Sequence, residues 1–558
     1  MAVKTTSDLL ARANGIRLSV ALGAVTPSTV GALIRDLIDS ILSPASEINP
    51  MQYGAIGDGS TSDNAALLNA ISAAVSAGVP VNGRGKTYGV AGNLVLISGT
   101  WLKDITFKQL TPGAAGDVRT LTSSGVNNLK FERVKVDRNG NGTNGAVNDD
   151  AGIYLDGGSG HYFEDVEVFG NDMGTGVSIH NATNFDMVRT HVHDMLYVLG
   201  ADPGDDRVQG IWLNGCSRFR NIEPKAHDLG GNFGTGATTK YSRGMVYSGC
   251  SDFTVLSPQA WNVDQGHDVS GSSGNVRFAI NGGLMSDCYT WGFKFANSAR
   301  DGTITGAVAV RCGQGGFVAS GPGDAISVMT GDLDFVGCEA YDTGSNGVWA
   351  TTSGFRIIEG ALGAAGSPRG IRFLSCKAHD RQGVPTMDYG YLSNVPANTD
   401  GRYNECIDCR TLGAGTAETS GINESYCAVS FNAAQSIANN AWQGVNWDID
   451  VDLGEMHSTS VNTSNIVIRR AGKYRVTYGA SFAANATGQR GVSLYKNGVQ
   501  FPGGMVLVNA ASAGETSLNV AFTIDCAVGT TLLLGVFQNS GGALNLQTSS
   551  SGVVEQLT

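Results

Sequence analysis

Four polar segments, which interrupt an otherwise apolar and glycine-rich chain, contain the residues best suited to chemistry. They read RNGNGTNGAVNDDA before Gly152, GADPGDDRVQ before Gly210, GNFGTGATTKYSR before Gly244, and DQGHDVSGSSG at 264–274. Paired carboxyl groups can cleave a glycosidic bond when they lie about 5 Å apart, with retention, or roughly 6.5–9.5 Å apart, with inversion. A dense acidic cluster also raises the pKa of one carboxyl group by like-charge repulsion, as a general acid requires.

Two of these segments supply the candidate catalytic acids, which are Asp149, Asp150, Asp205 and Asp206. The candidates for substrate binding are Arg207, Trp212, Lys240, Tyr241, Arg243, Asp264, His267, Asp268 and Trp291. The two tryptophans lie near the starts of expected strands, where an aromatic face can stack on a sugar ring. Elimination from a uronic acid is an alternative chemistry, for which Lys240, Tyr241 or Arg243 would be the base. A third interpretation is that the Asp-Asp and Asp-Gly pairs only form turns in solvated loops.

Short repeated strands are the elements that must position these segments. Gly-apolar-x-apolar strands start at Gly152, Gly176, Gly210, Gly244 and Gly292, which are separated by 24, 34, 34 and 48 residues. The pattern predicts a rung of about 24 residues, with ten-residue insertions in two rungs, and the 34-residue spacing of Phe185, Phe219 and Phe253 agrees with it. An all-β, single-stranded solenoid of roughly a dozen rungs is expected, fading near residue 412. Loops leaving one edge on successive rungs would line up about 4.8 Å apart and form the wall of a groove.

Three His-Asp pairs look like a base with its orienting acid, at His193-Asp194, His227-Asp228 and His379-Asp380. Trp261-Asn262 and Tyr341-Asp342 stand at what the repeat makes equivalent positions. A side chain that recurs at one corner of every turn favours a stacking ladder over several active sites.

Composition and charge exclude several classes of protein. The chain is 42% hydrophobic and only 15% charged, which excludes a disordered chain. Its net charge is −12 and it has no basic run, so no nucleic-acid partner is expected. No apolar stretch is long enough to insert into a membrane. The N-terminus lacks the apolar run of a secretory signal, so we expect synthesis in the cytoplasm and release by lysis.

The cysteines of a protein made in the cytoplasm are expected to be reduced. Cys216 and Cys250 stand at equivalent points of the repeat, which favours buried thiols over disulfides. Cys406 and Cys409 form a lone CxxC, which more often marks two core thiols than a zinc site. Neither a metal nor a cofactor is expected.

Residues 1–45 are predicted to form a separate N-terminal segment. Thr26-Pro27-Ser28-Thr29 precedes apolar residues spaced along one helical face, at Val30, Leu33, Ile34, Leu37, Ile38 and Ile41. A helix with such a stripe must bury it against a sister chain, an adaptor protein or the next domain of its own chain.

The segment from Met51 to Val90 has a more specific pattern. It consists of Gly54-Ala55-Ile56-Gly57-Asp58-Gly59, then Asp63, an Ala-rich stretch from Ala65 to Ala77, and Gly85-Lys86-Thr87-Tyr88. This pattern resembles the opening of the pectate-lyase-like superfamily found in phage tailspikes, although Asn82-Gly83-Arg84-Gly85 replaces the usual Pro-x-Gly. The resemblance implies a right-handed parallel β-helix over 46–424 whose first rung is covered by a helix. It does not specify a reaction.

Residues 425–558 change character, with short strands separated by Asn-Gly and Ala-Gly turns that indicate an antiparallel sandwich. The segment resembles the trimeric C1q/TNF-like jelly roll. The resemblance rests on Trp442 to Trp447, Ala471-Gly472-Lys473-Tyr474, Asn497-Gly498 and Gly535-Val536-Phe537-Gln538. It implies a homotrimer in which this domain clamps the three chains or binds carbohydrate.

The two resemblances together imply a phage tailspike. Such a protein is part of the virion, attaches to the tail or baseplate adaptor (here through residues 1–45), and binds a polysaccharide on the bacterial surface. The acidic segments favour cleavage of that O-antigen, capsule or exopolysaccharide by hydrolysis. A polysaccharide lyase of the same fold and a non-catalytic receptor-binding fibre are the alternatives. An esterase ranks lower because no GxSxG elbow is present.

Overall fold

The computed structural model describes residues 46–110, 118–140, 150–170, 174–195, 208–230, 242–271, 274–321, 330–345, 347, 349–359, 368–393, 404–420, 426–452, 456–469 and 471–557. The chain divides into two compact units, Met1–Lys294 and Phe295–Thr558, and each is described by itself. The helix predicted from Val30 to Ile41 lies outside the described residues. No described helix is long and apolar enough to cross a membrane.

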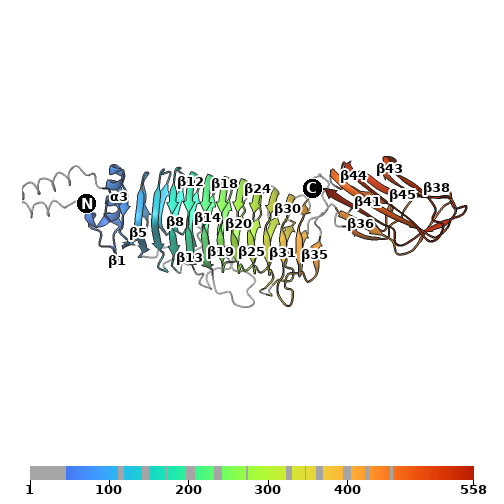
Figure 1. Cartoon of the computed structure of the whole chain (residues 1–558). Helices are drawn as coiled ribbons and strands as arrows, with labels where there is room; N and C mark the ends of the chain where they lie inside the picture. Colours follow the sequence, from blue (N-terminus) through green and yellow to red (C-terminus); the bar gives the residue numbers. More distant parts are fainter. Residues whose placement is uncertain are drawn as a thin grey trace, which may run out of the picture. The chain divides into compact units, whose positions relative to one another are not determined.

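The first unit opens with η1 (Pro50–Tyr53), β1 (Asp58–Ser62) and α3 (Asn64–Ala77). The Asp63 carboxylate accepts hydrogen bonds from the backbone N–H groups of Ile56 (2.7 Å) and Gly57 (3.2 Å), which explains the acid that follows the glycine-rich turn. Helix α3 buries Leu67, Ala70, Ile71 and Ala74 and packs near β2, β4 and β5 at the start of the coil (Figure 1). The predicted capping helix is therefore confirmed.

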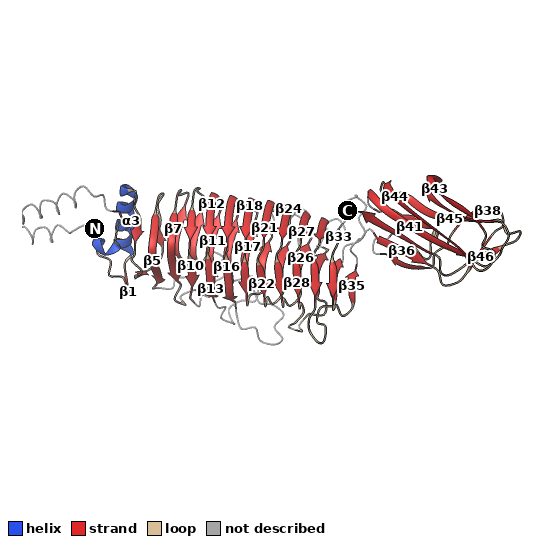
Figure 2. Ribbon diagram, in the orientation of Figure 1, coloured by secondary structure: helices blue, strands red, loops and turns tan. Residues whose placement is uncertain are grey.

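Parallel strands then wind into a right-handed β-helix with three strands in each full rung (Figure 2). One strand of each rung belongs to sheet B, which in the first unit contains β4 (Leu94–Val95), β6 (Arg119–Ser124), β8 (Ala151–Asp156), β11 (Gly174–His180), β14 (Val208–Asn214), β17 (Ser242–Ser248) and β20 (Gln265–Val269). The other two belong to sheet A, which contains β1, β2 (Val81–Asn82), β3 (Thr87–Val90), β5 (Trp101–Gln109), β7 (Lys130–Asp137), β9 (Tyr162–Glu164), β10 (Glu167–Phe169), β12 (Thr183–Val188), β13 (His191–Met195), β15 (Ser217–Ile222), β16 (Lys225–Leu229), β18 (Ser251–Leu256), β19 (Gln259–Trp261), β21 (Val276–Asn281) and β22 (Leu284–Ser286).

The second unit repeats this arrangement. Its strands of the sheet B kind are β26 (Gly315–Ser320), β29 (Ser353–Ile358), β32 (Tyr389–Ser393) and β35 (Ala417–Ser420). Its strands of the sheet A kind are β24 (Arg300–Thr305), β25 (Val308–Val310), β27 (Gly331–Val336), β28 (Glu339–Tyr341), β30 (Arg369–Leu374), β31 (Lys377–His379), β33 (Glu405–Ile407) and β34 (Arg410–Leu412). Strand β23 (Trp291–Phe295) spans the division between the units.

Identical positions on successive rungs stack into columns that fill the coil. The rings of Phe185, Phe219, Phe253 and Phe278 lie 4.9, 5.0 and 5.2 Å apart and nearly parallel. The glycine near the start of most sheet B strands faces a tight corner. A Cβ atom on Gly176, for example, would lie 2.3 Å from Cγ1 of Val192 and 2.8 Å from the carbonyl oxygen of Gly210. Because a side chain would not fit in this corner, glycine occupies the position in most rungs.

The repeat spacing predicted from sequence is confirmed, with one refinement. The 48 residues between Gly244 and Gly292 hold two rungs, because β20 places Gly266 in the same column. The expectation that 264–274 is a loop was wrong, since Gln265–Val269 forms a sheet B strand paired with β17.

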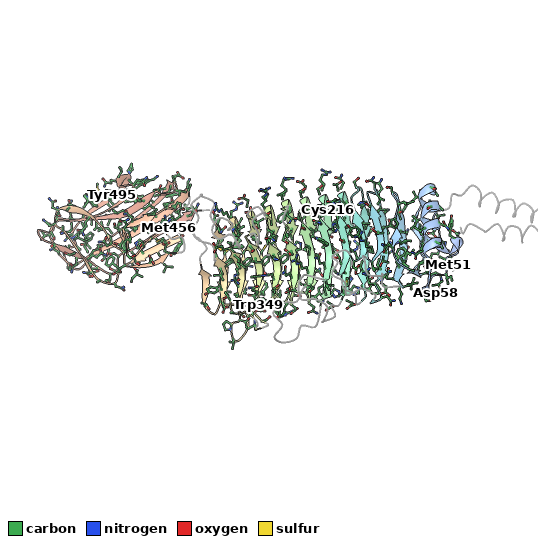
Figure 3. The ribbon with its side chains drawn as sticks, turned by 180° about the vertical axis from the view of Figure 1, so that it is seen from behind. Met51, Asp58, Cys216, Trp349, Met456 and Tyr495 are labelled. Carbon is green, nitrogen blue, oxygen red and sulfur yellow. The ribbon has the colours of Figure 1, made fainter. Side chains whose placement is uncertain are left out.

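The cysteines are free thiols, and all except Cys409 are buried. Cys216 (Figure 3) and Cys250 donate from Sγ to the carbonyl oxygens of Ile179 and Leu213, each at 3.3 Å, so they occupy equivalent corners of neighbouring rungs. Cys409 of the CxxC pair donates to the carbonyl oxygen of Phe373 at 3.2 Å. Across the described residues, no group of three or more metal-ligating side chains gathers at one place.

The C-terminal part of the second unit is the predicted antiparallel jelly-roll sandwich. One sheet runs in the order β44 (Thr516–Cys526), β41 (Gly472–Phe482), β47 (Ser551–Leu557), β36 (Tyr426–Ser430) and β39 (Ile449–Asp452), with β46 (Leu544–Leu546) and β37 (Gln435–Ile437) beyond one end of β41. The other runs β45 (Thr531–Gln538), β42 (Gln489–Lys496) and β43 (Val499–Asn509), with β38 (Ala441–Gly444) and β40 (Asn465–Val467) both on the far edge of β45. Trp447, Tyr474, Tyr478 and Phe482 lie in the core between them.

Candidate functional site

The outer face of sheet B in the first unit brings together several of the predicted site residues. Strand pairing places Tyr154, Ser178, Trp212, Val246 and Asp268 in one row across β8, β11, β14, β17 and β20. Because side chains alternate along a strand, neighbours in sequence point to opposite sides of the sheet. Asp268 therefore belongs to the outer row, whereas His267 points into the core between Tyr247 and Phe293, with ring centroids 4.9 and 5.7 Å away.

Asp268 is the centre of a charged cluster on this face. Its Oδ2 lies 3.0 Å from Nη1 of Arg243 and 3.7 Å from Nζ of Lys294. Lys294 also donates to Oε1 of Gln265 at 3.2 Å. Burial raises the pKa of Asp268, but the charges of Lys294 and Arg243 outweigh this effect and the pKa is lowered overall. The carboxylate is thus ionised and holds two cations in fixed positions.

Access to this cluster is unequal. Asp268 is fully buried, whereas the side chains of Arg243 and Lys294 are each 21% exposed. The two cations are therefore accessible from outside, whereas the Asp268 carboxylate is covered and holds them in position. Lys294 was not among the residues predicted from sequence, because only the three-dimensional stacking of β20 and β23 brings it to Asp268.

Three rings extend the same face. The imidazole of His180 lies 5.1 Å from the ring of Tyr154 and 4.7 Å from that of Trp212, and its Nε2 lies 2.8 Å from Oγ of Ser178. The guanidinium of Arg119 covers the Tyr154 ring at 3.5 Å. Trp212 is only partly buried, so its indole remains available to stack on a sugar ring.

The other predicted residues are not all on this face. Asp150 is buried at the start of β8, where Oδ1 accepts a hydrogen bond from the backbone N–H of Val118 at 2.5 Å, so it holds the preceding rung. Asp264 is buried just before β20 and its carbonyl oxygen accepts from Thr290. Trp291 is buried at the start of β23. Asp149, Asp205, Asp206, Arg207, Lys240 and Tyr241 lie outside the described residues.

His267 is a core residue, and its predicted position in a loop was wrong. Its side chain is fully buried, and neither ring nitrogen has a hydrogen-bond partner within the described part of the chain. Burial lowers the pKa of His267 to about 3. Nothing in the sequence indicates this burial, because a Gln-Gly-His-Asp run is typical of a polar turn until its register with β17 is known.

The histidines of two of the three His-Asp pairs, His193 and His227, lie in the stacking ladder that the repeat predicts. On sheet A, Phe169, His193, His227 and Trp261 pair in register, with successive ring centroids 5.5, 5.3 and 4.0 Å apart and planes within 13° of parallel. In the second unit, Tyr341 pairs with His379. The carboxylate of Asp380 does not orient His379, since it accepts from the backbone N–H groups of Thr386 and Met387 at 2.6 and 2.8 Å.

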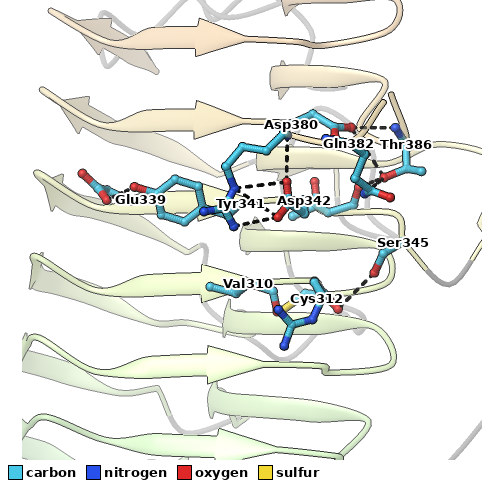
Figure 4. A network of polar contacts seen from close by, with 12 residues as sticks. Val310, Cys312, Glu339, Tyr341, Asp342, Ser345, Asp380, Gln382 and Thr386 are labelled. Carbon is cyan, nitrogen blue, oxygen red and sulfur yellow. Dashed lines mark hydrogen bonds and ion pairs between the residues drawn. The ribbon is translucent and has the colours of Figure 1, made fainter. Parts of the chain in front are cut away.

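Two further loops, missed in the sequence, are linked to each other in the second unit (Figure 4). The segment after β28 and the segment after β31 are joined because Nη2 of Arg381 donates to Asp342 at 2.7 Å. Oγ1 of Thr352 also donates to the carbonyl oxygen of Thr386 at 2.6 Å. These contacts show that loops on neighbouring rungs buttress one another, as a groove wall requires.

Comparisons with known proteins place the fold. No protein-family model matches the sequence, and neither does any curated protein. Among solved structures, the N-terminal fragment of bacteriophage Phi29 gene product 12 is similar at 14% identity, with a TM-score of 0.51, over 71% of this chain and 68% of that one. The A-module of the Azotobacter vinelandii mannuronan C-5 epimerase AlgE6 matches at 18% identity with a TM-score of 0.48, over 67% of this chain and 98% of that one.

The C1q-like resemblance of the C-terminal domain stays a prediction. The globular domain of the zebrafish complement 1qA protein matches at 11% identity, over 24% of this chain and 98% of that one, with a TM-score of only 0.20.

Proposed function

We propose that this chain is a phage tailspike that binds a bacterial surface polysaccharide on the outer face of sheet B in the first unit and cleaves it there. The observation that carries the proposal is the Arg243–Asp268–Lys294 cluster, which shares a row of outward residues with Trp212, two strands away. A buried carboxylate that fixes two partly exposed cations is a costly arrangement for a scaffold, and on a face that also carries an aromatic ring it suits a ligand with acidic groups and sugar rings. The fold likeness to a bacteriophage protein supports the phage origin.

Hydrolysis is the reaction we favour. It needs a proton donor and a second carboxylate on either side of the glycosidic bond. Asp268 is ionised and covered, so it does not serve as the donor. The Asp150 carboxylate already accepts a hydrogen bond from the backbone N–H of Val118 and is buried. The pair is therefore assigned to two of the three remaining acids, Asp149, Asp205 and Asp206, which belong to the acidic segments that adjoin β8 and β14.

Elimination is the second candidate, and the two cations favour it. A lyase must neutralise the carboxylate of a uronic acid before a base removes the neighbouring proton. Arg243 and Lys294 would bind that carboxylate, while Tyr241 or Lys240 would be the base.

The mass of the products distinguishes the two reactions. Purified protein is incubated with capsule or O-antigen of a host strain, and the products are analysed by mass spectrometry. Oligosaccharides one water heavier per cut would establish hydrolysis, and fragments unsaturated at one end would establish elimination. Intact polymer from every strain that the phage infects would overturn cleavage and leave a receptor-binding fibre. The Arg243→Gln variant should lose binding and cleavage, whereas the Arg372→Gln variant, altered at an exposed pair in the second unit, should retain both.

The proposal extends to assembly and location. Residues 1–45 attach the protein to the tail or baseplate adaptor, residues 46–424 engage the polysaccharide, and residues 425–558 hold a homotrimer together or add a carbohydrate contact. Strand β43 supports a partner for the last domain, because Met505, Val506, Leu507 and Val508 are 36–47% exposed along a strand that pairs with β42 alone in the described sheet. Light scattering of the purified chain should give the mass of three copies, and a monomer would contradict this part of the proposal.

A further inference from the structure

A groove with a volume of about 560 Å³ lies on the outer face of sheet A in the first unit, and none of the candidate site residues on sheet B lines it. Its floor includes Tyr162, Asp186, Arg220 and Thr254, which strand pairing aligns in one row across β9, β12, β15 and β18. The volume falls within the range of pockets that bind small molecules, about 300–1,000 Å³. Four strands spaced about 4.8 Å apart also give the row enough length for more than one sugar ring.

Most polar groups of the groove are already held by ion pairs between rungs. The guanidinium of Arg220 is paired with the carboxylate of Asp186 through two hydrogen bonds, of 2.8 and 2.5 Å. Asp252 is paired in the same way with Arg277, at 2.6 and 2.9 Å. These groups are rigid and their charges are neutralised.

Arg218 breaks this rule. Its Nε donates to Oδ1 of Asn184 at 2.8 Å, so its partner is a neutral amide. Other outward arginines, at different positions of the rung, bind carboxylates: Arg133 binds Asp104, Arg189 binds Asp165, and Arg372 in the second unit binds Asp334. Within the described residues, the terminal nitrogens of Arg218 make no hydrogen bond. Asp252 on the next rung interacts with the charge of Arg218, but its hydrogen bonds go to Arg277, so the terminal nitrogens of Arg218 remain available as donors at the wall of the groove.

We propose that this groove is a second carbohydrate site and that Arg218 binds the carboxylate of an acidic sugar there. Arginine matches a carboxylate through two parallel hydrogen bonds, and here its Nε is already fixed by Asn184. The ring of Tyr162, anchored by its hydroxyl on Glu164 at 3.2 Å, provides an apolar surface for the sugar. The Thr254 hydroxyl lies at the other end of the row. The ligand class rests on the proposed function, but the site does not depend on cleavage.

Binding of tetragalacturonate and of its methyl ester, measured by titration calorimetry, tests the site. Tetragalacturonate should bind the wild-type chain, and its uncharged methyl ester should bind at least tenfold more weakly. The Arg218→Gln substitution should lower the affinity for tetragalacturonate by at least tenfold, and Arg218→Lys should lose less of that affinity. Arg372→Gln, which removes an arginine with a carboxylate partner, is the matched control and should bind as the wild type does.

Two outcomes would overturn the proposal: equal binding of tetragalacturonate by Arg218→Gln and wild type, or equal binding of the acid and its ester. Absence of binding at millimolar concentrations would overturn it as well. The test is independent of cleavage on sheet B. Arg218→Gln should still cleave short fragments of the host polysaccharide if the proposed function holds, and a chain that cleaves nothing should still show binding that depends on Arg218.

Discussion

The outer faces of sheets A and B in the first unit are built from the same kinds of residue in opposite ways. On sheet A, charged side chains form exposed pairs between neighbouring rungs, such as Arg220 with Asp186, and similar pairs recur along the coil. On sheet B, Asp268 is fully buried between Arg243 and Lys294, and the described rungs contain no second copy of this cluster.

The difference shows how a solenoid separates scaffold from site. A contact that recurs at each rung stabilises stacking wherever it stands, so it carries no information about a ligand. The stacked Phe169, His193, His227 and Trp261 belong to this class, although each His-Asp pair alone looks catalytic. Residues that depart from the repeat are more informative about function, as Asp268 is on sheet B and Arg218 is on sheet A.

Replacing Asp268 should have the largest effect. Asp268→Ala leaves Arg243 and Lys294 near each other without their carboxylate, and removal of one member of a buried ion pair costs about 3–5 kcal/mol. We expect that loss in the free energy of unfolding in denaturant, together with loss of polysaccharide binding. Asp334→Ala, which breaks an exposed pair with Arg372, should cost less than about 1 kcal/mol. Equal losses in the two variants would remove the distinction between the two faces.

The fold could be predicted from sequence because every rung repeats its own local pattern. Gly152, Gly176, Gly210 and Gly244 mark the period, and the same period assigned the His-Asp pairs to a ladder. The acid at Asp63 likewise signalled the capped first rung.

The site could be predicted only in part, because it depends on register. Arg243, Asp268 and Trp212 were chosen as loop or strand-start residues, yet Arg243 contacts Asp268, and Trp212 shares their face, because β14, β17 and β20 stack. Lys294 has no motif of its own, so only its distance to Asp268 reveals it. Asp150 looked like its acidic neighbours but binds a backbone N–H, a role that sequence spacing does not show.

His267 and Asp268 are adjacent in sequence, so they test the two sides of one strand. The pKa of His267 is about 3, below the value of about 6.5 in an unfolded chain. The unfolded state therefore binds the proton more readily, and stability that is fully present above pH 6.5 is lost as the pH falls toward 3. His267→Phe should remove this loss, and at pH 4.5 it should raise the free energy of unfolding by about 2–3 kcal/mol relative to wild type.

Denaturant titrations of both proteins at pH 7.5 and pH 4.5 measure that difference. A phenyl ring suits the position between Tyr247 and Phe293, so the variant should be at least as stable as wild type at pH 7.5. If both proteins lose the same stability on acidification, His267 does not titrate in the folded core. Polysaccharide binding should be unaffected, which would distinguish the inner residue from its outer neighbour.

Trp212→Ala should have a smaller effect, confined to the ligand. Loss of one aromatic ring that stacks on a sugar costs about 1–2 kcal/mol, or roughly tenfold in affinity for the polysaccharide. Trp261→Ala is the matched control, because this tryptophan stacks on His227 in the ladder of sheet A. Surface plasmon resonance on immobilised polysaccharide should show weaker binding for the first variant alone. A larger loss of affinity in Trp261→Ala would indicate that the polysaccharide binds at the ladder on sheet A instead.

Arg372→Gln should have the smallest effect. The side chain is 46% exposed and shares its charge with Asp334 across one rung, an arrangement that water and salt screen strongly. Its loss should lower the free energy of unfolding by less than about 1 kcal/mol, and by less still in 0.5 M salt, because screening already weakens the pair in the wild type. Denaturant titrations at two salt concentrations measure both quantities. A large loss that does not depend on salt would show that the ion pairs on sheet A stabilise the coil more than their exposure implies. Repetition alone would then no longer separate scaffold from site.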